Sequence, residues 1–244
     1  MWLLLWQGSS MALAAAYPHG QLLLASPLQA LARLGQLAFT AAFWRAVGAS
    51  AAHILGGFAL SCAAAVALAA LSARFRLVEE VLRPLVAAVK AVPVVSFIIL
   101  ARVWLRSGAL PLFISALMVF PTVYLNVLAG IASADRQLLE MARVFRVPFG
   151  RTVRGIYLPA VLPYFRSACS LGLGLCWKSG VAAEVIGLPA GTIGERLYTA
   201  KIYFLTPDLF AWTAVIVAVS VLFERVFLAA VDVLAGKAGQ SWKS

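Results

Sequence analysis

Three charged residues stand inside long apolar segments of the chain: Lys90, Lys178 and Glu184. A charge within a membrane-crossing helix costs roughly 2.5 to 3.5 kcal/mol on insertion scales, so each needs a partner or a task. In one interpretation Lys178 attracts an anion on a polar path across the membrane, with the lining residues Trp177, Lys178, Ser179 and Glu184. In the other, Lys178 pairs with a neighbouring helix or extends to the headgroups, and Glu184 is a structural hydrogen-bond acceptor near the outer interface.

No residue pattern typical of an enzyme occurs in the sequence. It has no paired carboxylates, no cluster of His, Cys and carboxylate residues, and no glycine-rich phosphate loop, so we expect no catalytic residue, no metal site and no cofactor. The three cysteines, Cys62, Cys169 and Cys176, lie in apolar segments and are expected to be small buried side chains. Cys169 and Cys176 share a helix face with Gly172, which favours close packing of helices.

The stretch from Asp135 to Pro159 is a long polar interruption in this apolar chain, and it carries the arginines Arg136, Arg143, Arg146, Arg151 and Arg154. Its first half predicts a short amphipathic helix, with Asp135 as N-cap and one apolar stripe formed by Leu138, Ala142 and Phe145. Pro148 and Gly150 are expected to end this helix. A stripe of this kind between two membrane spans requires a cover, either a membrane surface or another protein.

The composition identifies an integral membrane protein. Of the 244 residues, 63% are hydrophobic and 12% are charged, and the mean hydropathy is +0.95. A soluble domain carries about 25% charged residues. The net charge of +11 matches basic loops on the cytoplasmic side of a membrane. Nucleic-acid binding is excluded as an interpretation because no soluble segment is long enough to form a recognition module.

A bilayer core needs about 20 mostly apolar residues per helix, which predicts an all-α, polytopic protein with about six transmembrane helices. We expect spans at Trp2–Ala16, Val47–Leu71, Val81–Trp104, Ala109–Ala134, Ala160–Leu188 and Leu209–Val231. The first of these lacks the positive start of a signal peptide, so a span is favoured over a cleaved leader. The chain then divides into an N-terminal helix with an interfacial segment (1–46), a core (47–233) and a tail (234–244).

The orientation follows from the positive charges. Arg74 and Arg76 end the second predicted span and are expected in the cytoplasm. Two spans later the stretch 135–159 returns to the same side, in agreement with its own basic residues. The tail, with Lys237 and Lys243, is expected there as well.

With the stretch placed, its residues resemble the EAA loop of the permease subunits of type I ABC importers. The family pattern is E-A-A, three residues, G, nine residues, then I-x-L-P, and the register fits without a gap. The matching residues are Glu140, Ala142, Ile156, Leu158 and Pro159. Met141 replaces the second alanine, and Arg146 replaces the glycine, which is the departure that affects the turn.

The resemblance implies that the loop forms a coupling helix that inserts into a groove on a cytoplasmic ATP-binding subunit. The residues it assigns to coupling are Leu138, Glu140, Ala142, Phe145, Arg146, Gly150 and Pro159. It also implies the permease fold of these importers, with a five-helix core and an additional N-terminal helix. The expected partners are two ATP-binding cassette subunits, which bind the ATP, a second permease copy, an extracytoplasmic substrate-binding protein and the lipid bilayer.

Similarity extends from about Ser26 to Val233. The runs Gly174–Trp177 and Ala182–Glu184, followed by several glycines, are similar to the nitrate, sulfonate and taurine branch of these permeases. The resemblance therefore implies a multi-pass protein of the bacterial inner membrane that transports a small solute, in one interpretation an anion, by alternating access. Two alternatives stay open: a secondary transporter driven by an ion gradient, with Glu184 as its ion site, and a membrane scaffold without transport activity.

Overall fold

The computed structural model describes residues 1–17 and 24–240, which are helical throughout apart from short connections. The helices are α1 (Trp2–Ala16), α3 (Pro27–Ala38), α4 (Ala41–Arg74), α5 (Arg76–Ala91), α6 (Val94–Trp104), α7 (Leu110–Ala132), α8 (Arg136–Val144), α9 (Phe149–Thr152), α10 (Leu158–Gly187), α11 (Ile193–Ile202) and α12 (Thr206–Gln240). A short π-helix, Val153–Tyr157, joins α9 to α10. The prediction of an all-α fold is confirmed.

Four helical stretches are long and apolar enough to cross a membrane, at 41–74, 110–132, 149–187 and 206–233. They correspond to four of the six expected spans. Three of them begin or end beyond the expected bounds because the helices continue past the apolar segment, and the span 110–132 lies within the expected 109–134. The last helix continues to Gln240, so most of the expected tail is helical.

The other two expected spans differ from the prediction. The segment Val81–Trp104 is divided between two helices, α5 and α6, which meet at an angle of 110° beside Pro93. Proline lacks the N–H that would continue the helix, and it forces extended backbone on Val92. Helix α1 has 15 residues, fewer than a bilayer requires. The count is therefore four spans, or five if the bent pair is one.

Helices α4, α7 and α10 form the centre of the bundle, and glycines bring their backbones together. A Cβ on Gly57 would lie 2.4 Å from the carbonyl oxygen of Leu112, and one on Gly180 would lie 2.6 Å from Ile54. Cys169 and Cys176 are fully buried in the same cluster, as expected from their spacing. The small-residue face of α10 is thus the surface on which the other central helices pack.

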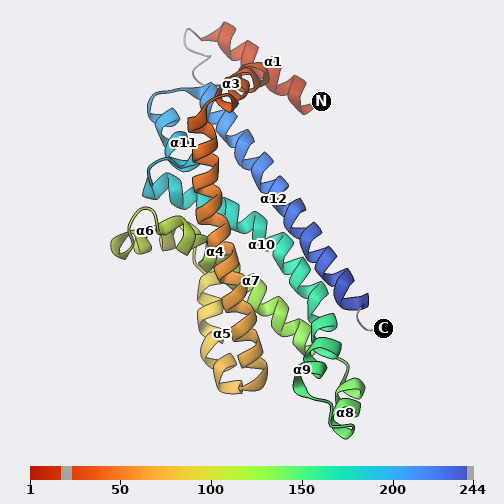
Figure 1. The fold of residues 1–244 in the computed structure, drawn as a ribbon. Coiled ribbons are helices and arrows are strands. Elements are labelled where there is room, and N and C mark those ends of the chain that lie inside the picture. Colours follow the sequence, from red (N-terminus) through yellow and green to blue (C-terminus); the bar gives the residue numbers. More distant parts are fainter. Residues whose placement is uncertain (18–23, 241–244) are drawn as a thin grey trace.

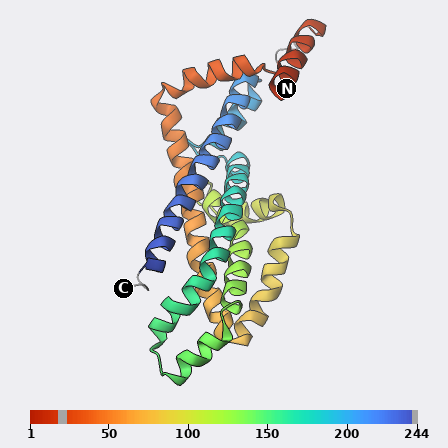
Figure 2. The same cartoon turned by 90° about the vertical axis from the view of Figure 1, so that its right-hand side faces the viewer.

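The long helix α12 lies against the outside of this centre (Figure 1). Two arginine–aspartate pairs connect it to other helices. Arg33 of α3 pairs with Asp208 at one end, and Arg166 of α10 pairs with Asp232 near the other. Figure 2 shows α3 lying across the end of the bundle instead of along its axis. The turn between α4 and α5 lies at the opposite end, the same end as α8 (Figures 1 and 2).

Candidate functional site

Helix α8 forms the far tip of the molecule at the end where the α4–α5 turn lies (Figure 1). Its first turn is capped by Asp135, whose Oδ1 accepts a hydrogen bond of 2.8 Å from the amide of Gln137. The predicted N-cap is therefore confirmed. The helix ends at Val144, earlier than Pro148 and Gly150 indicate.

The turn after α8 is closed by Arg146, which has a positive φ of 51°. The amide of Val147 donates to the carbonyl of Ala142 over 2.8 Å, and that of Arg146 donates to Arg143 over 3.1 Å. These two bonds form a Schellman motif with Arg146 at the left-handed position, where glycine is the common residue. The turn keeps the geometry that a glycine permits, and an arginine adopts it at a conformational cost.

The apolar face of α8 is exposed in this chain, but its composition differs from the predicted stripe. Leu138 is 43% exposed, Met141 47% and Phe145 75%, and the neighbouring Val144 and Phe149 are also open. Ala142 is only 5% exposed and lies on the inner side. The outward stripe is therefore Leu138–Met141–Phe145, and we call it the α8 face.

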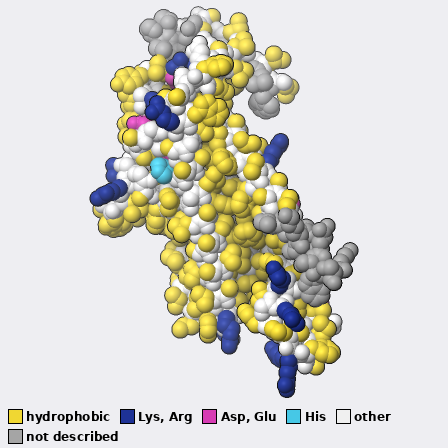
Figure 3. All heavy atoms as spheres, viewed as in Figure 1, with side chains coloured by type: hydrophobic (Ala, Val, Ile, Leu, Met, Phe, Trp, Pro, Cys, Tyr) yellow, Lys and Arg dark blue, Asp and Glu magenta, His cyan; other side chains and the backbone are white. Residues whose placement is uncertain are grey.

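Basic and polar side chains surround the α8 face. The arginines Arg136, Arg143, Arg146, Arg151 and Arg154 are all exposed, as is Glu140. Figure 3 shows Lys and Arg side chains gathered over this end of the molecule. Gly150 has no neighbouring atoms within 4 Å of an added Cβ, and Pro159 lies exposed in the first turn of α10. An apolar centre with a charged rim is the composition of a protein-binding surface.

The four candidate pathway residues do not share one surface. Trp177 is 1% exposed and stacks on Phe223 of α12 with ring centroids 5.9 Å apart. Ser179 is buried and donates to the carbonyl of Leu175 on its own helix. Lys178 is exposed. In this single chain only Lys178, of the four, faces outward.

Glu184 lies fully buried where α4, α10 and α11 meet. Its Oε2 accepts hydrogen bonds from the hydroxyl of Ser50, at 2.8 Å, and from the amide of Gly194, at 3.0 Å. The Ser50 hydroxyl in turn accepts from the amide of Ile193 at 2.9 Å. Both amides belong to the first turn of α11, so a carboxylate and a hydroxyl from other helices bind the N-terminal N–H groups of α11. We call this arrangement the Glu184 junction.

Two features show how tightly the Glu184 junction is built. A Cβ on Gly194 would lie 2.2 Å from the Cβ of Glu184, so only glycine fits there. His53 of α4 places its Nδ1 4.0 Å from the second carboxylate oxygen, Oε1. In this geometry Glu184 accepts structural hydrogen bonds from Ser50 and Gly194.

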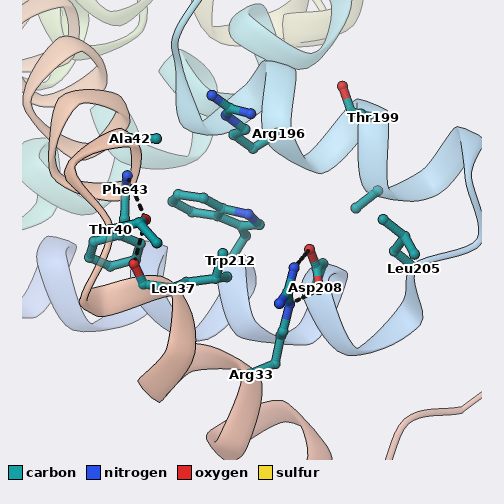
Figure 4. A pocket seen from close by; sticks show the side chains of 11 residues that line it. Arg33, Leu37, Thr40, Ala42, Phe43, Arg196, Thr199, Leu205, Asp208 and Trp212 are labelled. Atoms are coloured by element: carbon teal, nitrogen blue, oxygen red, sulfur yellow. Dashed lines mark hydrogen bonds and ion pairs between the residues drawn. The ribbon is translucent and has the colours of Figure 1, made fainter.

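A hollow of ≈ 200 Å³ lies at the opposite end of the molecule from α8, between α3, α4, α11 and α12 (Figure 4). Trp212 and Phe43 stack along one side with centroids 5.2 Å apart. The Arg33–Asp208 pair closes another side, and its hydrogen bond raises the pKa of Arg33. This pair joins the segment before the core to the start of α12.

Comparison with known proteins assigns the chain to a family. Residues 57–238 match the binding-protein-dependent transport system inner membrane component family. The chain belongs to this family. The match covers α5 to α12 and most of α4, and so includes α8 and all of the Glu184 junction except Ser50 and His53.

This permease is similar in sequence to permeases of other bacteria. It is 28% identical over 212 residues to a probable ABC transporter permease of Brucella melitensis, which covers 86% of each chain. It is 28% identical over 199 residues to a riboflavin transport system permease of Chloroflexus aurantiacus, covering 81% of this chain and 74% of the relative. It is 32% identical over 109 residues to a putative aliphatic sulfonates permease of Bacillus subtilis, covering 45% and 39%. The resemblance to importer permeases is thereby confirmed.

Sequence reasoning missed Ser50, Ile193 and Gly194 as partners of Glu184. Ser50 is 134 residues away from Glu184 in the chain, and no pattern around it indicates a polar contact. The signal that was present is the sequence Thr192-Ile193-Gly194-Glu195, which begins a helix with a capping residue and an acidic residue three positions later.

Proposed function

We propose that this permease and a second copy of it form the translocation pathway of an ATP-driven importer. In this proposal the α8 face docks in a groove of a cytoplasmic ATP-binding subunit. ATP-driven approach of two such subunits moves two α8 helices together and alternates the access of the pathway. An extracytoplasmic binding protein delivers the solute. The observation that supports this most strongly is the exposed α8 face, with its arginine rim.

Met141, which replaces the second alanine of the E-A-A pattern, is compatible with docking of the α8 face. The family's second alanine corresponds to a position that is outward-facing here, so the longer Met141 side chain lies on the contact surface and not in the chain's own core. Methionine adapts its shape to irregular apolar surfaces. The third position of the pattern, Ala142, is the buried one, and it keeps alanine.

The proposed orientation of the permease in the membrane follows from its positive charges. Five exposed arginines on α8 and the segment after it, together with Arg74 and Arg76 at the α4–α5 turn, make one end of the molecule strongly basic. Basic residues collect on the cytoplasmic side of membrane proteins. That end is therefore assigned to the cytoplasm of a bacterial cell, and α3, α11 and the hollow of Figure 4 to the opposite side.

The transported solute is proposed to be small, and the exposed Lys178 favours an anion. Glu184 is less suited to be the site of an ion-driven transporter because its carboxylate already binds the first turn of α11. This observation weighs against the secondary-transporter alternative.

The α8 face is tested by Phe145→Asp in the permease co-expressed with its ATP-binding subunits. A charge at the most exposed aromatic of the face should abolish co-purification of the ATP-binding subunit while the permease still inserts in the membrane. Tyr203→Asp, at a similarly exposed aromatic (69%) that follows α11, far from α8, is the matched control and should retain the complex. If the Phe145→Asp permease still co-purifies and transports, the coupling proposal is wrong.

Lys178 is tested separately by Lys178→Ala in the reconstituted complex. Uptake should fall while the amount of assembled complex stays the same, because the side chain is exposed and outside the packed core. Unchanged uptake would make Lys178 a structural or lipid-facing residue.

A further inference from the structure

Helix α5 lies at the edge of the bundle, with only Val86 and Val89 buried, and carries an unusual number of charges for a helix of a membrane protein. Its residues Arg76, Glu79, Glu80, Arg83 and Lys90 are charged, and all are exposed in the single chain. At 100° per residue, Glu79, Arg83 and Lys90 lie within about 40° of one another on one side of the helix. Leu77, Val81, Leu85 and Ala88 form an exposed apolar side nearly opposite.

The depth of Lys90 follows from the α4–α5 hairpin. Lys90 is 14 residues beyond Arg76, or about 21 Å along the helix at 1.5 Å per residue. The same distance back along α4 from Arg74 reaches the neighbourhood of Leu60, the middle of a segment without Asp, Glu, Lys or Arg. Val86 of α5 and Ala65 of α4 are both buried in the same core cluster.

A lysine at this depth cannot be explained by lipid contact. The centre of the apolar layer is about 15 Å from either surface, farther than a lysine side chain extends. In the described part of the chain Lys90 has no carboxylate within ion-pairing distance. A charged group so placed faces a water-filled cavity.

We infer that the charged side of α5 lines the aqueous translocation pathway and that Lys90 attracts the anionic solute at its midpoint. This inference rests on the proposed transport function, since the second permease copy supplies the opposite wall. The apolar side with Ala88 faces lipid or the partner copy. The 110° break between α5 and α6, three residues after Lys90, places the lysine where the span is discontinuous, a feature typical of transport sites.

The test uses adjacent reporter positions in the full complex in membrane vesicles. With Cys62, Cys169 and Cys176 replaced by alanine, Ala87→Cys places a thiol about 60° from Lys90, and Ala88→Cys places one about 160° away at the same depth. Methanethiosulfonate reagents with a sulfonate or a trimethylammonium head label only thiols that water reaches. We expect labelling at position 87 and at least tenfold slower labelling at 88. Equal labelling, or none at 87, would overturn the inference.

The charge of Lys90 is tested in the Ala87→Cys background. Lys90→Met should lower the ratio of anionic to cationic labelling rates about fivefold, as expected for one charge nearby in a watery path. Lys90→Arg and the distant Lys201→Met should leave the ratio unchanged. A ratio insensitive to Lys90→Met would show that this lysine does not attract anions. Labelling requires neither ATP hydrolysis nor the α8 contact, so these results are independent of the Phe145→Asp experiment.

Discussion

Helix α8 and helix α11 obtain the hydrogen bonds of their terminal backbone groups from different sources. Helix α8 completes its own backbone, with Asp135 at one end and the Arg146 turn at the other, and leaves its apolar side chains uncovered. In helix α11, by contrast, the first two backbone amides are bound by side chains of other helices, Ser50 and Glu184. A surface for a partner can thus be formed locally, whereas a junction inside the bundle requires the whole fold.

The largest effect in this comparison is expected from Gly194→Ala. The added methyl would lie 2.2 Å from the Cβ of Glu184 and 2.7 Å from its carbonyl carbon, so α11 must move away from α10. We expect a loss of about 3 kcal/mol in the free energy of unfolding, measured in detergent by SDS titration. Gly48→Ala, which meets open space on α4, is the control and should cost nothing. Equal behaviour of both variants would contradict the close contact.

Ser50→Ala should have the second largest effect. Its hydroxyl donates to Glu184 and accepts from Ile193, so its removal leaves two buried groups short of a hydrogen bond. We expect a loss of about 2 kcal/mol, seen in the same unfolding titration. Ser50→Thr keeps the hydroxyl and should recover part of the loss, and a stable Ser50→Ala permease would show that the junction contributes little.

Arg146→Gly should stabilise the turn after α8 by about 0.5 to 1 kcal/mol, because glycine adopts positive φ without the cost an arginine has. Slower hydrogen exchange at the amides of Arg146 and Val147 would measure this gain. Arg143→Gly applies the same change three residues earlier, inside the helix, and should speed exchange instead. The prediction fails if both variants change exchange in the same direction.

The smallest effect is expected from Phe145→Asp on the permease alone. Since Phe145 is 75% exposed, its replacement should change the free energy of unfolding by no more than about 0.5 kcal/mol. Unfolding of the isolated permease measures this directly. A large loss of stability would mean that the α8 face packs within its own chain, and the contrast with the Glu184 junction would disappear.

Much of the fold could be predicted from apolar length. Four long apolar segments became α4, α7, α10 and α12, because a segment of that length has few other stable states in a membrane. The break at Pro93 could not be predicted, since a proline in a span either kinks or ends it, and neighbouring helices decide which. The loop motif gave the position of α8, but it did not indicate that Ala142 faces inward while Met141 faces outward.

Local contacts of the candidate site could be predicted from the sequence, whereas contacts between distant helices could not. Capping by Asp135 involves residues two apart and is visible in the sequence, whereas the partners of Glu184 come from two other helices, α4 and α11. Lys178 and Glu184 are six residues apart, which places them about 120° from each other around α10, and one is exposed while the other is buried.

The distance in sequence between Ser50 and Glu184 also has a consequence for biosynthesis. Helix α4 leaves the ribosome more than a hundred residues before α11 exists, so Ser50 enters the membrane without its acceptor or its donor. The Glu184 junction closes only after Gly194 has been synthesised, and chains interrupted before that point carry an incomplete polar centre. Closure of this polar centre is therefore a late event in the synthesis of the chain.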